Sequence, residues 1–190
     1  MFVEKLSEHG FKEALYGLGL SYSRTSCKSI DEINIDDLLR TAKTLSNKQG
    51  GHNKFLESIF VWLNVRMPRY FWQEADTYRI STKQSESTIH TITKRPLVES
   101  DFTYISESLL KELNDRISIY KTVQDKQELF REIKSLLPEG FLQQRIWSLS
   151  YKTLQNIVMQ RKHHKLNEWK FFVYEVMRQI DHPYFIEKTD

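Results

Sequence analysis

The stretch that decides the fold reads Ile59-Phe60-Val61-Trp62-Leu63-Asn64-Val65, and Arg66-Met67-Pro68 follows it. β-Branched and aromatic residues in such a run favour a β-strand. Every second residue from 59 to 65 is aliphatic and belongs to one face of the strand, while Phe60 and Trp62 belong to the other. Because both faces carry apolar side chains, we expect a strand that is covered on both sides.

Helical spacing of apolar residues predominates on both sides of this strand. It predicts a short helical segment within residues 2–15 and a helix from Ile35 to Leu45. After the strand, Pro68 can start a helix that runs from Arg69 to Arg79. The second half of the chain predicts further helices over Ile105–Val123, Leu129–Leu137, Tyr151–His164 and Leu166–Ile180.

Two segments between these helices lack helical spacing. The polar segment Ser81–Ser87 has no apolar periodicity and is predicted as a loop. Thr88–Thr93 alternates and is predicted as a second strand that ends before Pro96, after which only helices are expected. Strands in the first half and helices in the second predict a single α+β domain over residues 1–190.

Composition narrows the class of protein. The 190 residues include 28 Lys and Arg against 25 Asp and Glu, so the net charge of +3 argues against nucleic-acid or membrane-surface partners. No apolar run approaches the roughly 20 residues of a membrane span. The single cysteine, Cys27, excludes an internal disulfide and a cysteine-rich zinc site. We expect an intracellular, cytoplasmic protein with little choice of thiol nucleophile.

No metal site and no glycine-rich phosphate loop is expected. His163 and His164 are adjacent and therefore point to different faces of a helix, and no His-Glu-x-x-His spacing occurs. Gly50-Gly51 precedes no Lys-Ser or Lys-Thr pair. Nucleotide binding would therefore have to come from side chains.

One predicted helix carries polar residues that could do so. Lys152 and Arg161 are nine residues apart on it, near two and a half helical turns, and Asn156 lies between them. Charged residues on a helix ordinarily belong to its solvated surface. Asn156 lies among apolar residues, where a carboxamide is either a structural tie or a ligand contact.

The segment from Gly51 to Ser58, followed by the strand and by Arg66-Met67-Pro68, resembles the flavin-dependent thymidylate synthases, also called thymidylate synthase complementing proteins. That family shows Gly-His-x-Ser-x-x-Glu-His, a strand, and then the signature Arg-His-Arg-x-x-Ser-x-Asn-Glu-x-Ser-x-Arg. Counted without gaps from His52 and Glu57, the signature falls on residues 77–89, Thr77-Tyr78-Arg79-Ile80-Ser81-Thr82-Lys83-Gln84-Ser85-Glu86-Ser87-Thr88-Ile89. Part of it is kept, so the chain resembles a divergent member with a degenerate signature.

Weaker matches follow in the same order and extend the resemblance from about Ser23 to Pro183. The early Ala-Arg-Val-Ser of the family resembles Ser23-Arg24-Thr25-Ser26. Its Arg-x-x-Leu-Pro, Asn-x-Arg-Ser-Leu and Asn-x-x-x-x-Arg correspond to Lys134–Pro138, Ser150–Leu154 and Asn156–Arg161.

The resemblance implies both a fold and an activity. Its fold is a compact α+β domain with a central, mostly antiparallel sheet packed by helices. Such enzymes are homotetramers with FAD and dUMP in sites at subunit junctions. Reduced flavin, recharged by NADPH, passes a hydride while a one-carbon unit moves from methylenetetrahydrofolate to C5 of uracil. This methyltransferase chemistry needs no cysteine nucleophile, which is compatible with the solitary Cys27.

Carried over by position, the resemblance implies two sets of site residues. The cofactor set consists of His52, Glu57, Tyr78, Arg79, Lys152 and Asn156. The nucleotide set consists of Glu74, Ser87, Lys134 and Arg161, of which Ser87 and Arg161 would also be catalytic. A dianionic phosphate is best held by at least two cations, and Lys134 and Arg161 supply them.

The departures from the signature keep other functions open. Four signature positions have lost their family residue: Arg is replaced by Thr77, Asn by Gln84, Glu by Ser85 and Arg by Ile89. Lys54 stands where the family has serine. Tyr78 replaces His with a ring that can stack on isoalloxazine or adenine. One alternative is therefore an inactive member that binds a nucleotide or acts as an oligomeric binding or regulatory protein. Another follows from Glu74, which replaces Gln: a carboxylate accepts from the N4 amine of cytosine, so the enzyme would be a dCMP methylase or hydroxymethylase.

Overall fold

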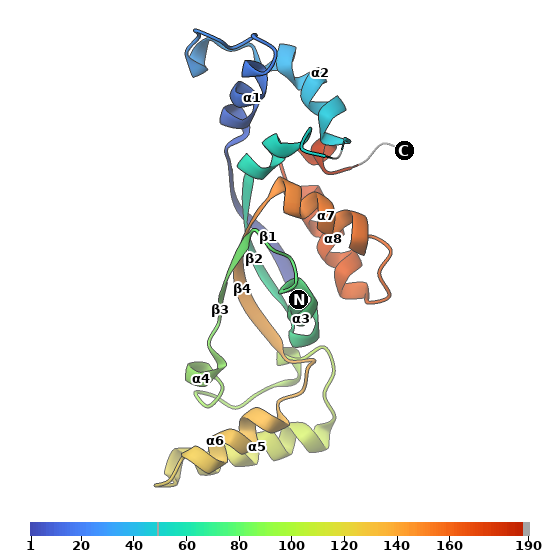
Figure 1. The fold of residues 1–190 in the computed structure, drawn as a ribbon. Coiled ribbons are helices and arrows are strands. Elements are labelled where there is room, and N and C mark those ends of the chain that lie inside the picture. The colour runs from blue at the N-terminus through green and yellow to red at the C-terminus, as the bar shows by residue number, and fades with distance from the viewer. Residues whose placement is uncertain (49, 188–190) are drawn as a thin grey trace. The chain divides into compact units, whose positions relative to one another are not determined.

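The computed structural model describes residues 1–48 and 50–187. Within these residues, four strands form one antiparallel sheet in the order β1-β2-β4-β3 (Figure 1). The strands are β1 (Phe2–His9), β2 (Phe60–Pro68), β3 (Ser81–Ser85) and β4 (Leu142–Ser150). The predicted α+β class with a mostly antiparallel sheet is confirmed.

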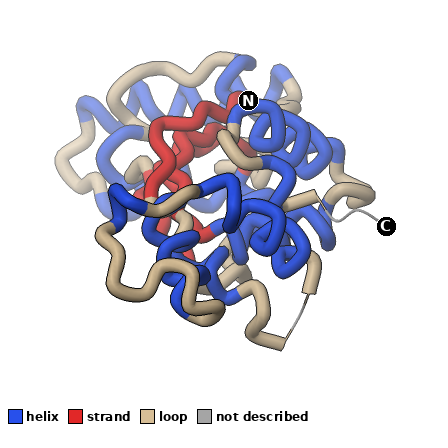
Figure 2. The backbone as a smooth tube through the Cα atoms, turned by 90° about the horizontal axis from the view of Figure 1, so that it is seen from above, coloured by secondary structure: helices blue, strands red, loops and turns tan. Residues whose placement is uncertain are grey.

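Along the chain, helices separate the strands and follow the last of them, and Figure 2 shows more helix (blue) than strand (red). The α-helices are α1 (Phe11–Leu20), α2 (Ile35–Ser46), α3 (Arg69–Ala75), α4 (Thr88–Thr91), α5 (Glu107–Thr122), α6 (Gln127–Leu136), α7 (Tyr151–Arg161) and α8 (Asn167–Gln179). Short 3₁₀ segments are η1 (Ile30–Glu32), η2 (Lys54–Ser58), η3 (Glu99–Asp101) and η4 (Pro183–Phe185). The helices predicted around residues 35–45, 105–137 and 151–180 are confirmed. The helix predicted from Arg69 to Arg79 begins as expected but ends at Ala75, so Tyr78 and Arg79 lie outside it.

The chain divides into two compact units. Unit 1 consists of Met1–Phe2, Val65–Thr77 and Gln84–Arg145. Unit 2 consists of Val3–Asn64, Tyr78–Lys83 and Ile146–Asp190. The single domain expected over residues 1–190 stays a prediction.

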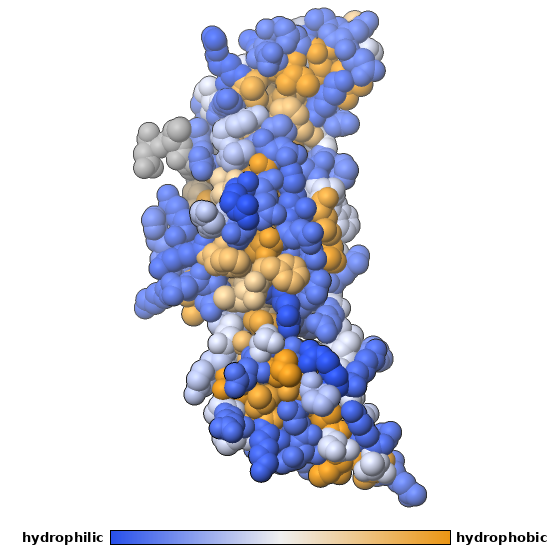
Figure 3. Space-filling model, turned by 180° about the vertical axis from the view of Figure 1, so that it is seen from behind, coloured by the Kyte–Doolittle hydropathy of each residue, from blue (hydrophilic) through white to orange (hydrophobic). Residues whose placement is uncertain are grey.

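The deciding strand forms as predicted, but only one of its faces is fully buried. Val61, Leu63 and Val65 have no exposed surface, whereas Phe60 and Trp62 each keep 37% of theirs. The expectation of a strand covered on both sides therefore holds for its aliphatic face alone. Other apolar groups also reach the protein surface, as the orange areas of Figure 3 show.

Unit 2 has an aromatic core beside α7 and α8. The rings of Trp147 and Phe172 stack with centroids 5.4 Å apart, and Trp169 meets Phe172 edge to face at 5.8 Å. All three side chains are fully buried. Burial of rings of this size supplies a large part of the hydrophobic stabilisation of a small unit.

Unit 1 has a separate core between the α5–α6 pair and the segments around it. Leu113 and Ile117 of α5 pack with Ile133 of α6 in one cluster of buried side chains. Phe102 and Phe141 join this cluster and form an antiparallel bridge between their backbones. The amphipathic spacing that predicts α5 and α6 therefore marks the faces that build this core.

The first predicted helical segment is partly wrong, because Phe2–His9 forms β1. Phe2 and Leu6 are four residues apart, a spacing that fits a helix but also places both residues on one face of a strand. The strand ends at Gly10, whose φ of 88° is left-handed. A Cβ at Gly10 would lie 2.1 Å from the carbonyl oxygen of Ser58, so this turn requires glycine.

Three further assignments between residues 81 and 150 are wrong. Ser81–Ser85 is strand β3 and not a loop; it lies at the edge of the sheet, where a strand can be polar on both faces. Thr88–Thr91 is one turn of helix and not a strand. β4 is not predicted from the sequence, because glutamines and an arginine interrupt the apolar alternation before Trp147 and Leu149.

No helix in the described part of the chain combines the length and the apolar character needed to cross a membrane.

Candidate functional site

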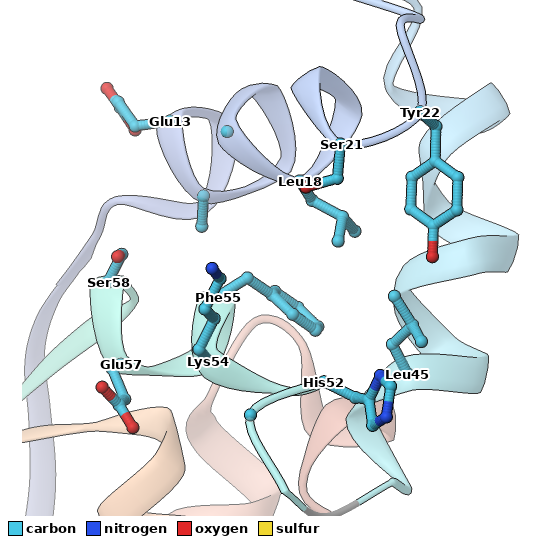
Figure 4. Close-up of a pocket in the computed structure, with 13 residues that line it drawn as sticks. Glu13, Leu18, Ser21, Tyr22, Leu45, His52, Lys54, Phe55, Glu57 and Ser58 are labelled. Carbon is cyan, nitrogen blue, oxygen red and sulfur yellow. The ribbon is translucent and has the colours of Figure 1, made fainter.

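Two of the predicted cofactor residues, His52 and Glu57, line a cavity of about 610 Å³ in unit 2 (Figure 4). The cavity lies between α1, the end of α2 and the segment that contains η2. Its wall on the α1 side includes Glu13, Leu18, Ser21 and Tyr22, and its opposite wall includes Lys54, Phe55 and Ser58.

The lining of this cavity combines rings with charges. The ring of Phe55 extends into the space below α1, and Tyr22 and His52 lie at the far end from Glu57 (Figure 4). Cavities of roughly 300–1,000 Å³ with apolar walls and a few polar groups are typical small-molecule sites. This cavity can therefore hold the ring of a ligand and bond its hydroxyl or phosphate groups.

Lys152 of α7 is bonded to the segment that carries His52. Its Nζ donates to Oδ1 of Asn53 at 2.5 Å. Asn53 is buried, and its amide nitrogen donates to the carbonyl of Ser46 and to Oε1 of Gln155, both at 3.3 Å. The structure therefore joins two predicted cofactor residues through Asn53, which the sequence analysis did not single out.

The signature residues after Thr77 are attached to the same helix. The hydroxyl of Thr153 donates to the carbonyls of Arg79 at 3.2 Å and of Ile80 at 3.3 Å. Ile80 has a φ of 59°, so these bonds hold a strained backbone. Arg79 is exposed, as is Asn156, whose Oδ1 accepts from Nε2 of Gln160 at 3.2 Å.

Arg161 ends α7 in a cluster of aromatic side chains. Its Nε donates to the Tyr78 hydroxyl at 2.7 Å, and a terminal nitrogen lies 2.8 Å from Nε2 of His164. Its guanidinium also lies over the ring of Trp169, 4.8 Å from the centroid. Stacking and hydrogen bonds together hold the guanidinium in one orientation.

Tyr78 is the residue that links the signature to Arg161. Only 8% of Tyr78 is exposed, and its ring meets Trp169 edge to face at 6.1 Å. Its hydroxyl accepts from Arg161 and donates to Gln160 at 2.9 Å. The structure thus shows Tyr78 as a partner of Arg161, while its stacking on a flavin or adenine ring stays a prediction.

The remaining nucleotide residues lie in unit 1. Lys134, in the last turn of α6, donates from Nζ to the hydroxyl of Thr88. Ser87 is the exposed residue that immediately precedes Thr88 and α4. Burial, and then the charge of Arg69, lower the pKa of Lys134. Glu74 is a half-buried residue of α3.

Within the described part of the chain, neither a metal centre nor a buried thiol adds to these residues. Among residues 1–48 and 50–187, no three His, Cys, Asp or Glu side chains lie close enough to hold a metal ion. Cys27 is an exposed thiol. The candidate site therefore depends on cations, carboxylates, hydroxyls and rings.

No protein-family model matches the sequence, and no curated protein does. Among solved structures, the chain is similar to the flavin-dependent thymidylate synthase ThyX from Helicobacter pylori complexed with FAD and dUMP. That match has a TM-score of 0.71, 15% identity and coverage of 98% of both chains. A second structure of ThyX from Helicobacter pylori, with FAD and dUMP, matches with a TM-score of 0.72 at 15% identity, over 98% of this chain and 97% of that one. This chain has the flavin-dependent thymidylate synthase fold.

The flavin-dependent thymidylate synthase fold was predicted from motifs that are weak individually and informative in their order. At 15% identity the likeness shows the fold alone, so the roles of the site residues stay predictions. Asn53, Thr153 and Thr88 hold predicted site residues in place but were not themselves predicted. Each is a polar residue next to a predicted site residue in the sequence, and that position was the signal that could have identified them.

Proposed function

We propose that this chain is a divergent, FAD-dependent enzyme of the thymidylate synthase type that acts at C5 of a pyrimidine deoxynucleotide, dUMP. One observation carries the proposal: nearly the whole chain shares its fold with a protein whose structures hold FAD and dUMP. By the same resemblance the enzyme is a cytoplasmic homotetramer, and it uses NADPH and methylenetetrahydrofolate as co-substrates.

The residues of unit 2 fit the chemical groups of FAD. The cavity beside η2 offers an aromatic wall at Phe55, and Glu57 can accept from sugar hydroxyls. Lys152 and Arg79 carry positive charge on and beside α7, which suits a pyrophosphate. When bound and reduced, FAD supplies the hydride of the reaction.

The residues assigned to the nucleotide have separate tasks. By the resemblance, Arg161 offers a guanidinium to the nucleotide. In unit 1, Lys134 offers an ammonium to its phosphate, and Ser87 offers a hydroxyl to the pyrimidine. The Tyr78 hydroxyl keeps Nε of Arg161 fixed, which lowers the entropy lost when the guanidinium binds an anion.

The net reaction balances with the proposed co-substrates. The pyrimidine C5 loses a proton and gains the methylene carbon of methylenetetrahydrofolate. The two folate nitrogens that lose this carbon take up that proton and one from solvent, so the donor leaves as tetrahydrofolate. One hydride reduces the transferred carbon to a methyl group, and NADPH restores the hydride donor. No thiol takes part, which agrees with the position of the only cysteine, Cys27, on the surface.

A spectroscopic titration tests this proposal. Purified protein mixed with FAD should show a perturbed flavin absorption spectrum, and dUMP should perturb it further. Parallel titrations with dUMP and dCMP test the role of Glu74, because a carboxylate at the base favours the N4 amine of cytosine. If no flavin binds at concentrations well above those of cellular cofactors, the proposed enzyme function is wrong.

A second candidate function is nucleotide binding without catalysis. Thr77 replaces an arginine of the signature and donates its hydroxyl to the carbonyl of Glu74 at 2.7 Å. Tyr78, at the position of the signature histidine, is packed inside unit 2. Protein that binds dUMP but never FAD would support this candidate over the enzyme.

A further inference from the structure

Arg69 is a second cation near Lys134. Unlike Lys134, it belongs to none of the motifs found in the sequence. It begins α3, and one of its terminal nitrogens donates to the carbonyl of Leu137 at 3.0 Å. Leu137 directly follows α6, whose last turn carries Lys134. Two positive side chains from separate segments of unit 1 therefore converge at the end of α6.

Two hydroxyl groups belong to the same neighbourhood. Thr88, only 8% exposed, accepts a hydrogen bond from Nζ of Lys134. The preceding residue, Ser87, is exposed, and its side chain makes no capping bond to α4. The bond to Thr88 brings the ammonium of Lys134 next to the turn where the predicted nucleotide contact Ser87 lies.

The two cations differ in their acidic partners. Arg69 forms an ion pair with Glu139 at 3.4 Å, and Glu139 also accepts from Gln73 at 2.8 Å. In the described residues no carboxylate lies within 4 Å of the Lys134 ammonium. Burial and repulsion by Arg69 lower the pKa of Lys134, as expected for a cation that lacks an anionic partner.

We propose that Arg69 and Lys134, with the hydroxyl of Thr88, form a subsite in unit 1 for a phosphate group beside Ser87. The inference rests on the proposed nucleotide-binding function and adds Arg69 and Thr88 to its residues. The last arginine of the family signature is replaced here by Ile89, which is 62% exposed and carries no charge. Arg69 supplies a guanidinium in the same unit, at the end of α6, and its planar fork suits a phosphate.

Arg69 and Lys134 could also serve only to stabilise the carboxyl end of α6, where cations are favoured. The two roles predict different behaviour of variants. A cation that only stabilises the helix lowers the melting temperature when it is replaced and leaves anion affinity unchanged. A half-buried cation that waits for an anion costs stability, so its replacement weakens binding without lowering the melting temperature.

Calorimetric titration of the full chain with dUMP and with inorganic phosphate tests the subsite. We expect Arg69→Gln and Lys134→Met each to weaken dUMP binding about 10- to 100-fold, the effect of losing a charge-assisted bond. Lys134→Met should not lower the melting temperature. The control Arg116→Gln removes a positive charge that pairs with Glu112 and Glu132 elsewhere in unit 1, and it should bind dUMP as the wild type does.

Each outcome separates the subsite from the proposed function. If dUMP binds and neither Arg69→Gln nor Lys134→Met changes its affinity, the subsite is wrong, as is the assignment of Lys134 to the phosphate, while dUMP binding itself still supports the proposed function. If dUMP does not bind but phosphate does, with the same two variants weakened, the subsite stands without the nucleotide. Absence of binding by both probes overturns the inference. Should Arg69→Gln not fold, Arg69→Lys keeps the charge, and its phosphate affinity decides the same question.

Discussion

Arg161 shows how one side chain can satisfy its own bonds and still suit a ligand. Tyr78, His164 and Trp169 fix the guanidinium by two polar contacts and one stacking contact. Arginine has five N–H donors in one rigid plane, so partners that hold some of them also set the direction of the others. A fixed guanidinium binds a phosphate with less loss of rotamer freedom than a mobile one.

We predict that Arg161→Ala weakens dUMP binding by about 1.5–3 kcal/mol, the range for hydrogen bonds to charged groups. Arg161→Lys should lie between this variant and the wild type, because it keeps the charge and loses the planar fork. Calorimetric titration of the three proteins measures the differences in affinity.

A matched control for Arg161 is available on the neighbouring helix. Arg178 is exposed on α8 and pairs with Glu175, so Arg178→Ala removes the same charge without touching the cluster. Its dUMP affinity should equal that of the wild type. Equal affinities for Arg161→Ala and Arg178→Ala would show that Arg161 is a structural tie between the signature and α7.

At the scale of elements, α7 contains two of the predicted cofactor residues, Lys152 and Asn156, and contacts two more, Tyr78 and Arg79. Its first turn is capped by Ser150. The buried Ser150 hydroxyl accepts from the backbone N–H of Thr153 at 3.2 Å. Thr153 in turn holds the backbone carbonyls of Arg79 and Ile80. The cap therefore holds the residue, Thr153, that binds the backbone of the signature segment to the start of α7.

Ser150→Ala should lower the free energy of unfolding by about 0.5–2 kcal/mol, because the first turn of α7 loses its cap. Chemical denaturation followed by circular dichroism measures the change. Ser106→Ala is the comparison, since Ser106 caps α5 from an exposed position with a longer bond of 3.4 Å. A cost for Ser150→Ala no greater than for Ser106→Ala would contradict this account of α7.

The elements that the sequence predicts share a visible apolar periodicity. β2, α2 and the four helices from α5 to α8 have buried side chains at regular spacing, and such spacing is read directly from the chain. β3 and β4 lack such a periodicity. They are strands because they pair with neighbouring strands, and this pairing cannot be read from their own side chains. The turn at Gly10 shows the same limit, because its requirement for glycine comes from Ser58, 48 positions away.

At the scale of the whole molecule, the predicted site residues fall into both units. The order of the motifs predicts these residues but not the contacts that each of them makes. Lys152 bonds to Asn53, Tyr78 to Arg161 and Lys134 to Thr88, and none of these partners follows from spacing along the chain. Arg69 lies outside every motif, so only the folded unit 1 brings it to Lys134.

Each unit also contains a group that makes stability depend on pH. Burial alone would raise the pKa of Asp101 in unit 1, but hydrogen bonds from Arg95 and Val98 and the charge of Arg66 lower it below its usual value. Burial lowers the pKa of His182 in unit 2.

The groups that face His182 come from three segments. Its ring stacks on Phe11 at 3.6 Å, and its Nδ1 lies 2.9 Å from the Tyr184 hydroxyl. The charges of Glu8 and Asp181 favour its protonated form, whereas the charge of Lys5 opposes it. The net direction remains downward because burial is the largest cause.

Both shifts act on stability in the same direction. For each group the folded chain releases its proton more readily than the unfolded chain does, so the unfolded chain binds more protons and acid favours unfolding. The contribution of His182 should fall as the pH drops below about 6.5, and that of Asp101 as it drops below about 4. Melting temperatures measured by calorimetry from pH 8 to pH 3 should therefore decline in two steps.

His182→Gln should flatten the first step and Asp101→Asn the second, whatever their effect on stability at pH 8. A wild-type profile that is level between pH 7 and pH 5 would contradict the assignment to His182, and a second step that persists in Asp101→Asn would contradict the other.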